Sequence, residues 1–282
     1  TAYTARALQK CSLTVHISTK LNRSHLVTGK TALILPCIGR TEKDLQNGNP
    51  QFVSVENSAG VVHKSIGNKQ PVSEHLLSEP KIVVEMGKAI IGENGSIDWD
   101  YMTDNYDNIR NYIQQVVPGF ENYNERVRKP GGFYLPNGAR AGIFKTATGK
   151  ASFTVNRLAG HNLKEGEFLM MTIRSHDQFN TTIYGLNDRY RCIYNERRVV
   201  LINPQDAQKA ALKAGDVVNL KSHFNGQERI AEKFLVVPYD IPPKCIATYF
   251  PEANVLVPVD SFADHSYTPA SKSVVVTVVK SV

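Results

Sequence analysis

The sequence predicts a chain of two parts with different fold classes, an α/β part over residues 1–150 and a mainly β part over residues 151–282. In the first part, strand-like segments are followed by helical ones. In the second, short apolar strands recur at regular spacing, which is typical of a barrel or a sandwich. Between them lies RVRKPGGFYLPNGAR, residues 126–140, a turn-rich segment that we expect to be an exposed connection.

Three predicted strands open the first part. They are SLTVHIST, TALILP and QFVSVEN, at residues 12–19, 31–36 and 51–57. The segment VSEHLL after Pro71 is expected to be helical, and Pro80 opens another helix at the first-turn position where proline is tolerated. Over residues 98–117 apolar side chains recur at helical spacing, and Pro118 follows as a helix breaker.

The second part contains a series of predicted short strands and one more specific unit. The strands are ASFTV, EFLMMTI, RRVVLIN, DVVNLKS, RIAEKFLVV, KCIATYF, NVLVPV and SVVVTVV, beginning at residues 151, 167, 197, 216, 229, 244, 254 and 273. In the unit, RRVVLIN is followed by a short helix that Pro204 opens, by a turn at Gly215, and by the next strand. This order is the repeat seen in double-psi β-barrels, and we expect residues 151–282 to form such a barrel.

Composition is that of an ordinary globular protein, since 41% of the 282 residues are hydrophobic and 21% are charged. No apolar run reaches the roughly 20 residues that span a bilayer, and the first residues lack the features of a signal peptide. We therefore expect a cytoplasmic location and no membrane partner. The four cysteines are scattered without a CxxC pair, which predicts reduced thiols and no cysteine-bound metal.

The charge of the chain is positive without being concentrated. Its net charge of +7 would permit nucleic-acid binding, but the 33 Lys and Arg are spread among 26 Asp and Glu without a basic block. Nucleic acid is therefore a disfavoured partner, and an anionic small molecule would suit the same positive surface.

The strongest functional signal is RSHDQFNTTIYGLNDRYR, residues 174–191, which follows the predicted strand EFLMMTI. We call this segment the polar loop. Its arginines offer the donors that suit phosphate, and its Asp and Asn side chains match the donors and acceptors of a purine. The alternative is a surface ion-pair network between Asp188 and Arg189 or Arg191, which would contribute little stability. Ligand binding is slightly favoured over it on chemistry alone.

Other candidates give weaker signals. Arg40, Thr41 and Glu42 follow a predicted strand at the edge where ligands bind in α/β sheets, although an Arg40–Glu42 pair would explain them as well. Cys37 is expected to be a small buried residue rather than a nucleophile. No GxSxG, HExxH, GxGxxG or P-loop pattern is present. Asn254 is either a turn residue or a match for a heterocycle.

Several longer motifs occur together and in order, and they resemble a known family. The polar loop, with YFPEANVLVP, TPASKSVVVTV, LPCIGRTEKD, SVENSAGVVHKSIG and PVSEHLLSEPKIV, resembles the molybdopterin oxidoreductases of the formate-dehydrogenase-like FdhF/YdeP type. The resemblance covers nearly the whole chain. It implies the C-terminal part of a longer enzyme, with the end of the α/β cofactor domains followed by a molybdopterin-dinucleotide-binding barrel. The start at Thr1 rather than Met agrees with a fragment.

The resemblance implies a bis(molybdopterin guanine dinucleotide) cofactor that carries molybdenum or tungsten, while the metal's protein ligand and any iron–sulfur cluster would lie upstream. The implied cofactor contacts are Arg174, Ser175, His176, Gln178, Asn180, Thr181, Thr182, Asp188, Arg189, Arg191, Asn254 and Lys272, with Arg40, Glu42, Glu56 and His63 as lesser candidates. No catalytic or metal-ligating residue is assigned. Cys192 and Lys244 stand where similar sequences are expected to have glycine, which bears on the local turn conformations.

The expected function is therefore the cofactor-binding part of a molybdenum or tungsten oxidoreductase, with formate suggested only by the family. Its partners would be the cofactor, a small-molecule substrate and an unidentified electron acceptor. Two alternatives are a non-catalytic nucleotide-binding or interaction module on a double-psi barrel, and a basic nucleic-acid-binding protein, whose binding would weaken with salt.

Overall fold

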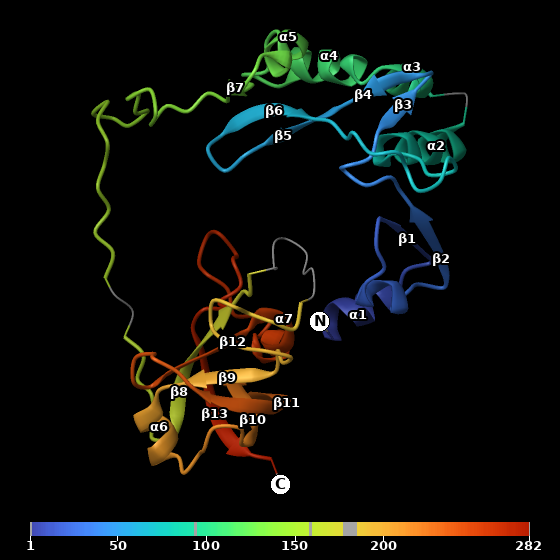
Figure 1. Cartoon of the computed structure of the whole chain (residues 1–282). Helices are drawn as coiled ribbons and strands as arrows, with labels where there is room; N and C mark the ends of the chain where they lie inside the picture. The colour runs from blue at the N-terminus through green and yellow to red at the C-terminus, as the bar shows by residue number, and fades with distance from the viewer. Residues whose placement is uncertain (1, 93–94, 158–159, 177–184, 282) are drawn as a thin grey trace. The chain divides into compact units, whose positions relative to one another are not determined.

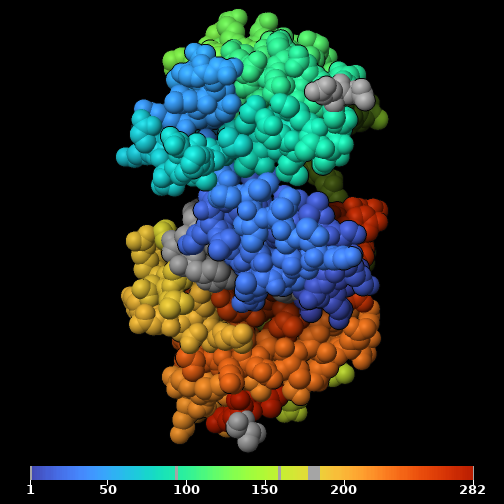
Figure 2. Space-filling view, turned by 90° about the vertical axis from the view of Figure 1, so that its right-hand side faces the viewer, coloured from blue at the N-terminus to red at the C-terminus, as the bar shows by residue number. Residues whose placement is uncertain are grey.

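A computed structural model describes residues 2–92, 95–157, 160–176 and 185–281 (Figure 1). Contacts group the chain into two units, one of Thr1–Arg6 with Asn156–Val282, which we call the barrel unit, and one of Ala7–Val155, the α/β unit. In the space-filling view, most of the barrel unit is yellow to red and most of the α/β unit is blue to green (Figure 2). The predicted domain boundary at residues 150 and 151 stays a prediction, because two such units need not fold independently.

Six strands of the barrel unit close into a ring in the order β10-β11-β9-β12-β8-β13. Their bounds are β8 Glu167–Ile173, β9 Val199–Ile202, β10 Val217–Phe224, β11 Gln227–Pro238, β12 Cys245–Tyr249 and β13 Val274–Lys280. The pairs β8·β12 and β9·β11 are parallel, and the other four are antiparallel. The closed ring confirms the prediction of a barrel, and the double-psi topology stays a prediction. A closed ring also leaves no unpaired strand edge within it.

Two apolar clusters stabilise the barrel. They lie on opposite faces of the strands because successive side chains of a strand point to opposite faces. In β9, Val200 and Ile202 belong to the larger cluster with Met170 and Phe234, whereas Val199 and Leu201 belong to a second one. The second cluster also contains Ile173, Ala247 and Tyr249. Both faces of β9 are thus buried, and the second cluster brings Tyr249 to the loops that follow β8.

Short helices connect the strands of the barrel. They are α6 Pro204–Lys209, α7 Phe250–Ala253 and the 3₁₀ helix η2 Asn254–Leu256. The predicted helix after Pro204 is confirmed, and Asn203 caps it by accepting from the Gln205 amide at 2.9 Å. The predicted strand at residues 254–259 is wrong, since this segment begins as η2 and inserts Leu256 into the barrel core.

The described residues of the α/β unit form three small sheets and several helices. Its elements are α1 Ala2–Gln9, whose first residues belong to the barrel unit, β1 Leu13–Ser18, η1 Arg23–Leu26, β2 Thr31–Pro36, β3 Asp44–Gln46, β4 Asn49–Gln51, β5 Val53–Glu56, β6 Val61–Ser65, α2 Glu79–Ile91, α3 Trp99–Asp104, α4 Asp107–Val116, α5 Tyr123–Arg128 and β7 Phe133–Tyr134. β1 pairs with β2 in parallel, β3 with β4 antiparallel, and β6 lies between β5 and β7. This mixture confirms the α/β character of the first part.

Local signals explain where these helices begin and end. Ser78 caps α2, and Pro80 lies in its first turn as predicted. The helix predicted over residues 98–117 is interrupted, because Asn105 is extended and its side chain accepts from the Asp107 amide at 2.9 Å. The predicted helix VSEHLL and the predicted strand ASFTV are absent, and the predicted exposed connection contributes buried Phe133 to β7.

A buried arginine braces the α/β unit. Arg110, 4% exposed, forms an ion pair with Asp107 and donates to the Phe52 carbonyl at 3.0 Å and to Asn124 at 2.7 Å. Its guanidinium carbon also lies 4.0 Å from the centre of the Phe52 ring. Among the described helices, none is long and apolar enough to cross a bilayer.

Candidate functional site

Three segments meet at one end of the barrel because of the strand register. β8 and β12 run parallel with Ile173 opposite Tyr249, so the residues that follow both strands leave from the same end. β13 is antiparallel to β8, and just before it the Ser271 carbonyl accepts from the Thr172 amide at 3.1 Å. The start of the polar loop, α7 and Lys272 therefore share this end, which we call the β8 end.

Two cations lie together at the β8 end. Lys272 donates from Nζ to the Thr172 carbonyl, two residues before Arg174. Partial burial lowers the pKa of Lys272, and the positive charge of Arg174 lowers it further. Like charges repel, and an anion such as a phosphate would relieve that repulsion while accepting the fork of donors that Arg174 offers.

Asp188 is a buried support rather than half of a surface ion pair. Its side chain is 2% exposed and its Oδ2 accepts from Tyr249 Oη at 2.7 Å and from Arg191 at 2.6 Å. The Tyr190 amide donates to Oδ1 at 3.1 Å. Burial acts to raise the pKa of Asp188, but the hydrogen bonds from Tyr249 and Arg191 outweigh it, and the pKa lies below its ordinary value. The ion pair with Arg191 that the alternative expected is therefore present, but Asp188 is buried rather than at the surface.

The two arginines near the end of the polar loop reach back to its start. Arg191 donates to the Arg174 carbonyl at 3.2 Å, and Arg189 donates to His176 Nε2 at 2.6 Å. The His176 ring also contacts the Tyr190 ring edge-on, with centroids 4.9 Å apart. These contacts bring five of the predicted residues together, namely Arg174, His176, Asp188, Arg189 and Arg191.

Arg197 is a residue of this site that the sequence did not reveal. It is 5% exposed and donates from one nitrogen to Ser175 Oγ at 2.9 Å and to the Gly185 carbonyl at 3.4 Å. Its Nε donates to Glu252 in α7 at 2.9 Å, and its guanidinium lies over the Tyr249 ring at 4.7 Å. An arginine at the start of a strand is usually a solvated charge, so no sequence pattern marks it.

The remaining predicted residues of this end are placed only in part. Asn254 begins η2, two residues after Glu252, and is partly buried. Gln178, Asn180, Thr181 and Thr182 lie outside the residues that the structure describes. The assignment of cofactor contacts to all of these residues stays a prediction.

Cys192 and Lys244 adopt the backbone conformation that favours glycine. Their φ angles are 54° and 64°, in the left-handed region. Cys192 follows Arg191 directly, and the Lys244 amide donates to Asp206 at 2.6 Å. The turns expected of glycine are therefore kept with other side chains, at a cost in backbone energy.

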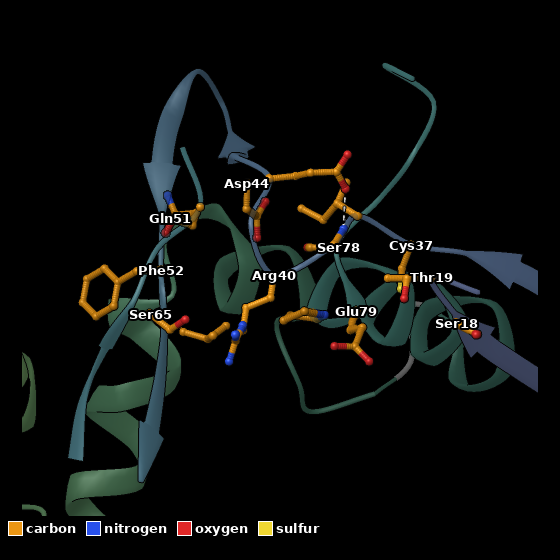
Figure 3. A pocket seen from close by; sticks show the side chains of 16 residues that line it. Ser18, Thr19, Cys37, Arg40, Asp44, Gln51, Phe52, Ser65, Ser78 and Glu79 are labelled. Carbon is orange, nitrogen blue, oxygen red and sulfur yellow. Dashed lines mark hydrogen bonds between the residues drawn. The ribbon is translucent and has the colours of Figure 1, made fainter. Parts of the chain in front are cut away.

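The α/β unit has a pocket of its own at the ends of β1 and β2, with a volume of about 460 Å³. Figure 3 shows Arg40 reaching into it between Ser65 and Glu79. Glu42 does not pair with Arg40, because its carboxylate accepts from the Gly39 and Val72 amides. Glu42 therefore shapes the loop, and Arg40 forms no ion pair with a described residue.

The other candidates of the α/β unit divide between structure and surface. Buried Cys37 lies in the wall of the same pocket, and burial, with Glu79 nearby, raises the pKa of its thiol. It is thus a small buried residue, as predicted. Glu56 lines a second, polar pocket with Arg140. His63 lies on β6 and its Nδ1 is 3.2 Å from the Lys64 carbonyl. Over the described part of the chain, no three His, Cys, Asp or Glu side chains gather to hold a metal.

Comparison with known proteins agrees with this arrangement. Residues 168–275, which cover the barrel strands except the first residue of β8 and most of β13, match the family model described as Molydopterin dinucleotide binding domain. An uncharacterized oxidoreductase of Mycobacterium tuberculosis is 50% identical over 98% of this chain and 36% of its own length. Protein YdeP of Escherichia coli is 38% identical over 95% of this chain and 36% of its own length. The chain belongs to the molybdopterin oxidoreductase family.

The chain thus spans about a third of the length of these oxidoreductases. A solved structure, acetylene hydratase from Pelobacter acetylenicus, resembles this molybdopterin oxidoreductase chain with a TM-score of 0.54 at 14% identity, over 88% of this chain and 38% of that one. At this identity the likeness concerns the fold.

The donor set at the β8 end fits a dinucleotide cofactor of the molybdopterin family. Arg174 and Lys272 supply adjacent positive charge for a pyrophosphate, and Ser175 supplies a hydroxyl beside them. By contrast, Asp188 has both oxygens engaged within the protein. It therefore supports the site rather than offering a free acceptor.

Proposed function

We propose that this chain binds the guanine dinucleotide form of molybdopterin at the β8 end of the barrel, as the cofactor-binding part of a molybdenum or tungsten oxidoreductase. The observation that carries the proposal is that Lys272 donates to the Thr172 carbonyl, two residues before Arg174, within a barrel of the matching family. Arg174 and Lys272 would bind the pyrophosphate, and Ser175 and His176 would orient the groups next to it. Asn254 would donate to and accept from the heterocycle.

The cofactor, when bound, supplies the metal-centred redox chemistry, and this chain supplies binding and orientation. The order of elements supports the proposal that the ring is a double-psi barrel. Strand β9, the short helix α6 and a Gly-Asp turn precede β10, as expected of that repeat. We also propose a bis(pterin) cofactor, a formate-like substrate and a cytoplasmic location. These finer assignments rest on the family resemblance, as does an iron–sulfur cluster, which would be encoded upstream.

Arg40 and the pocket of the α/β unit extend the proposal to the first part of the chain. Arg40 offers a positive charge in a cavity at the carboxyl ends of two parallel strands. This is the edge where α/β sheets bind ligands. We propose that Arg40 binds an anionic ligand group in this pocket. Glu56 and His63 lie on neighbouring strands, and the proposal assigns them no contact with the cofactor.

The test compares wild-type protein with Arg174→Ala and Lys272→Ala after purification from cells that make the cofactor. Guanine nucleotide released by acid and metal measured by mass spectrometry should both fall at least about tenfold in each variant, as loss of a charge-assisted contact implies. Lys233→Ala, on the exposed part of β11, is the control and should keep its cofactor. Unchanged nucleotide and metal contents in both site variants would disprove the assignment.

A second measurement, on the full-length protein that contains this chain, separates the enzyme from a non-catalytic nucleotide-binding module. Full-length protein that carries molybdenum or tungsten and reduces a dye with formate supports the full proposal. Guanine nucleotide without either metal would instead support the non-catalytic module.

A further inference from the structure

We infer that Arg197 is a positioning residue, which orients Ser175 as a hydrogen-bond donor to the cofactor and ties α7 to the same place. The inference rests on the proposed function and adds a residue to it. Arg197 would act through Ser175 and Glu252 rather than by touching the cofactor itself.

The contacts of Arg197 join two parts of the polar loop to α7, which is distant in the sequence. One terminal nitrogen donates to Ser175 Oγ, two residues after β8, and to the Gly185 carbonyl, which is in the second half of the polar loop. Nε donates to Glu252 in α7, two residues before Asn254. A guanidinium holds its donors in one rigid plane, so a single side chain fixes the relative positions of these segments.

The hydrogen bond to Ser175 also decides what that hydroxyl can do. A serine hydroxyl has one hydrogen to donate and two lone pairs that accept. Because Ser175 Oγ accepts from Arg197, its own hydrogen must point elsewhere, and it donates to no acceptor among the described residues. Ser175 is 6% exposed, so an unused donor there is costly unless a ligand accepts it.

An ion pair with Glu252 alone would not explain this arrangement. Buried ion pairs are often replaced by apolar side chains without loss of stability, because desolvation offsets the attraction between the charges. The two interpretations therefore differ in one respect. If Arg197 only neutralises Glu252, removing both charges restores the protein, whereas a positioning role is lost with the guanidinium.

The experiment measures guanosine diphosphate binding by calorimetry and the thermal midpoint of the free chain. Arg197→Met should weaken guanosine diphosphate binding about tenfold, the size of one charge-assisted hydrogen bond. The double variant Arg197→Met with Glu252→Gln should recover the thermal midpoint but not the affinity. Arg198→Met, which removes the neighbouring arginine bonded to the Glu232 carbonyl, is the control and should bind like wild type.

Two further variants keep the test decisive if Arg197→Met does not fold. Arg197→Lys keeps the charge but not the planar fork, and should bind as weakly as Ser175→Ala, with no further loss when the two are combined. Recovery of affinity in the charge-free double variant, or full affinity in Arg197→Lys, overturns the positioning role alone. Wild-type protein that does not bind guanosine diphosphate contradicts the proposed function and this inference with it.

Discussion

Tyr249 donates its hydroxyl hydrogen to Asp188 over 2.7 Å and thereby joins the end of β12 to the polar loop. Burial, and then the contact with Asp188, raise the pKa of Tyr249, which keeps the phenol protonated as a donor. The pair connects the second apolar cluster of the barrel, to which Tyr249 belongs, with the loop that carries Arg189 and Arg191.

Tyr249→Phe should lower the free energy of unfolding by about 1–3 kcal/mol at neutral pH, because buried Asp188 loses one of its side-chain donors. Urea denaturation of the free chain measures the effect. Tyr194→Phe, at a tyrosine that is 62% exposed, is the matched control and should leave the unfolding midpoint unchanged. Equal midpoints for wild type and Tyr249→Phe would show that Arg191 alone suffices to support Asp188.

The same pair predicts a pH dependence of stability. Asp188 has a lowered pKa in the folded state, so its ionised form stabilises the fold above the ordinary value of 3.8. That contribution is lost as the pH falls through the lower folded-state pKa. The stability difference between wild type and Tyr249→Phe should therefore be largest above pH 3.8 and shrink below it. Urea titrations from neutral pH downward test this, and a difference that grows on acidification would contradict it.

Arg110→Met should destabilise the α/β unit by about 3–5 kcal/mol, because it leaves Asp107 partly buried with Arg128 as its remaining cation. Arg128→Met should cost less than about 1 kcal/mol, since Arg128 has a side chain that is 44% exposed. Chemical denaturation of both variants measures the contrast. Equal losses would mean that the two ion pairs with Asp107 contribute alike and that the burial of Arg110 adds nothing.

Cys192→Gly and Lys244→Gly should each stabilise the barrel by up to about 1 kcal/mol. A side chain at positive φ costs about 1–2 kcal/mol, and the greater freedom of unfolded glycine offsets part of the gain. Lys209→Gly, in α6, should instead lower stability, because no such relief exists in a helix. Urea midpoints rank the three variants, and a loss of stability in both of the first two would contradict the prediction.

Lys272 should react faster with an amine-acylating reagent at pH 8 than exposed lysines such as Lys129, because a lowered pKa leaves more of it uncharged. Arg174→Ala should slow this reaction, since removing the neighbouring charge raises the pKa of Lys272 again. Peptide mass spectrometry after brief labelling gives the site-specific rates. An unchanged rate in Arg174→Ala would place the two cations too far apart to share a phosphate.

The sequence was informative wherever a signal was local. TALILP corresponds to β2, Thr31–Pro36, and EFLMMTI to β8, Glu167–Ile173, because apolar runs bounded by turn residues specify strands. The segment NVLVPV carries a similar run, yet it follows Pro251 in α7 and packs Leu256 into the barrel. Its helical geometry is decided by the core that it enters, and no property of the segment alone indicates it.

The candidate site shows the same division. Arg174, Lys272 and the arginines of the polar loop could be predicted from a dense polar segment and a family resemblance. Arg197 could not, since its importance comes from the distance between β8 and α7 in the folded barrel. Likewise, the role of Asp188 as a support depends on Tyr249, which is distant in sequence and meets it only through the register of β12 against β8.

The parallel register of β8 and β12 also fixes when the site can exist during folding. β8 pairs with β12 and β13, both of which follow it only after most of the barrel sequence. Such long-range pairing forms late, because the entropy of closing the intervening loop must first be overcome. We therefore expect the β8 end to be assembled only when the ring closes. Loss of β13 would then remove the strand that follows Lys272 and leave Arg174 on an incomplete sheet. We therefore expect a chain that lacks β13 to have no cofactor site at the β8 end.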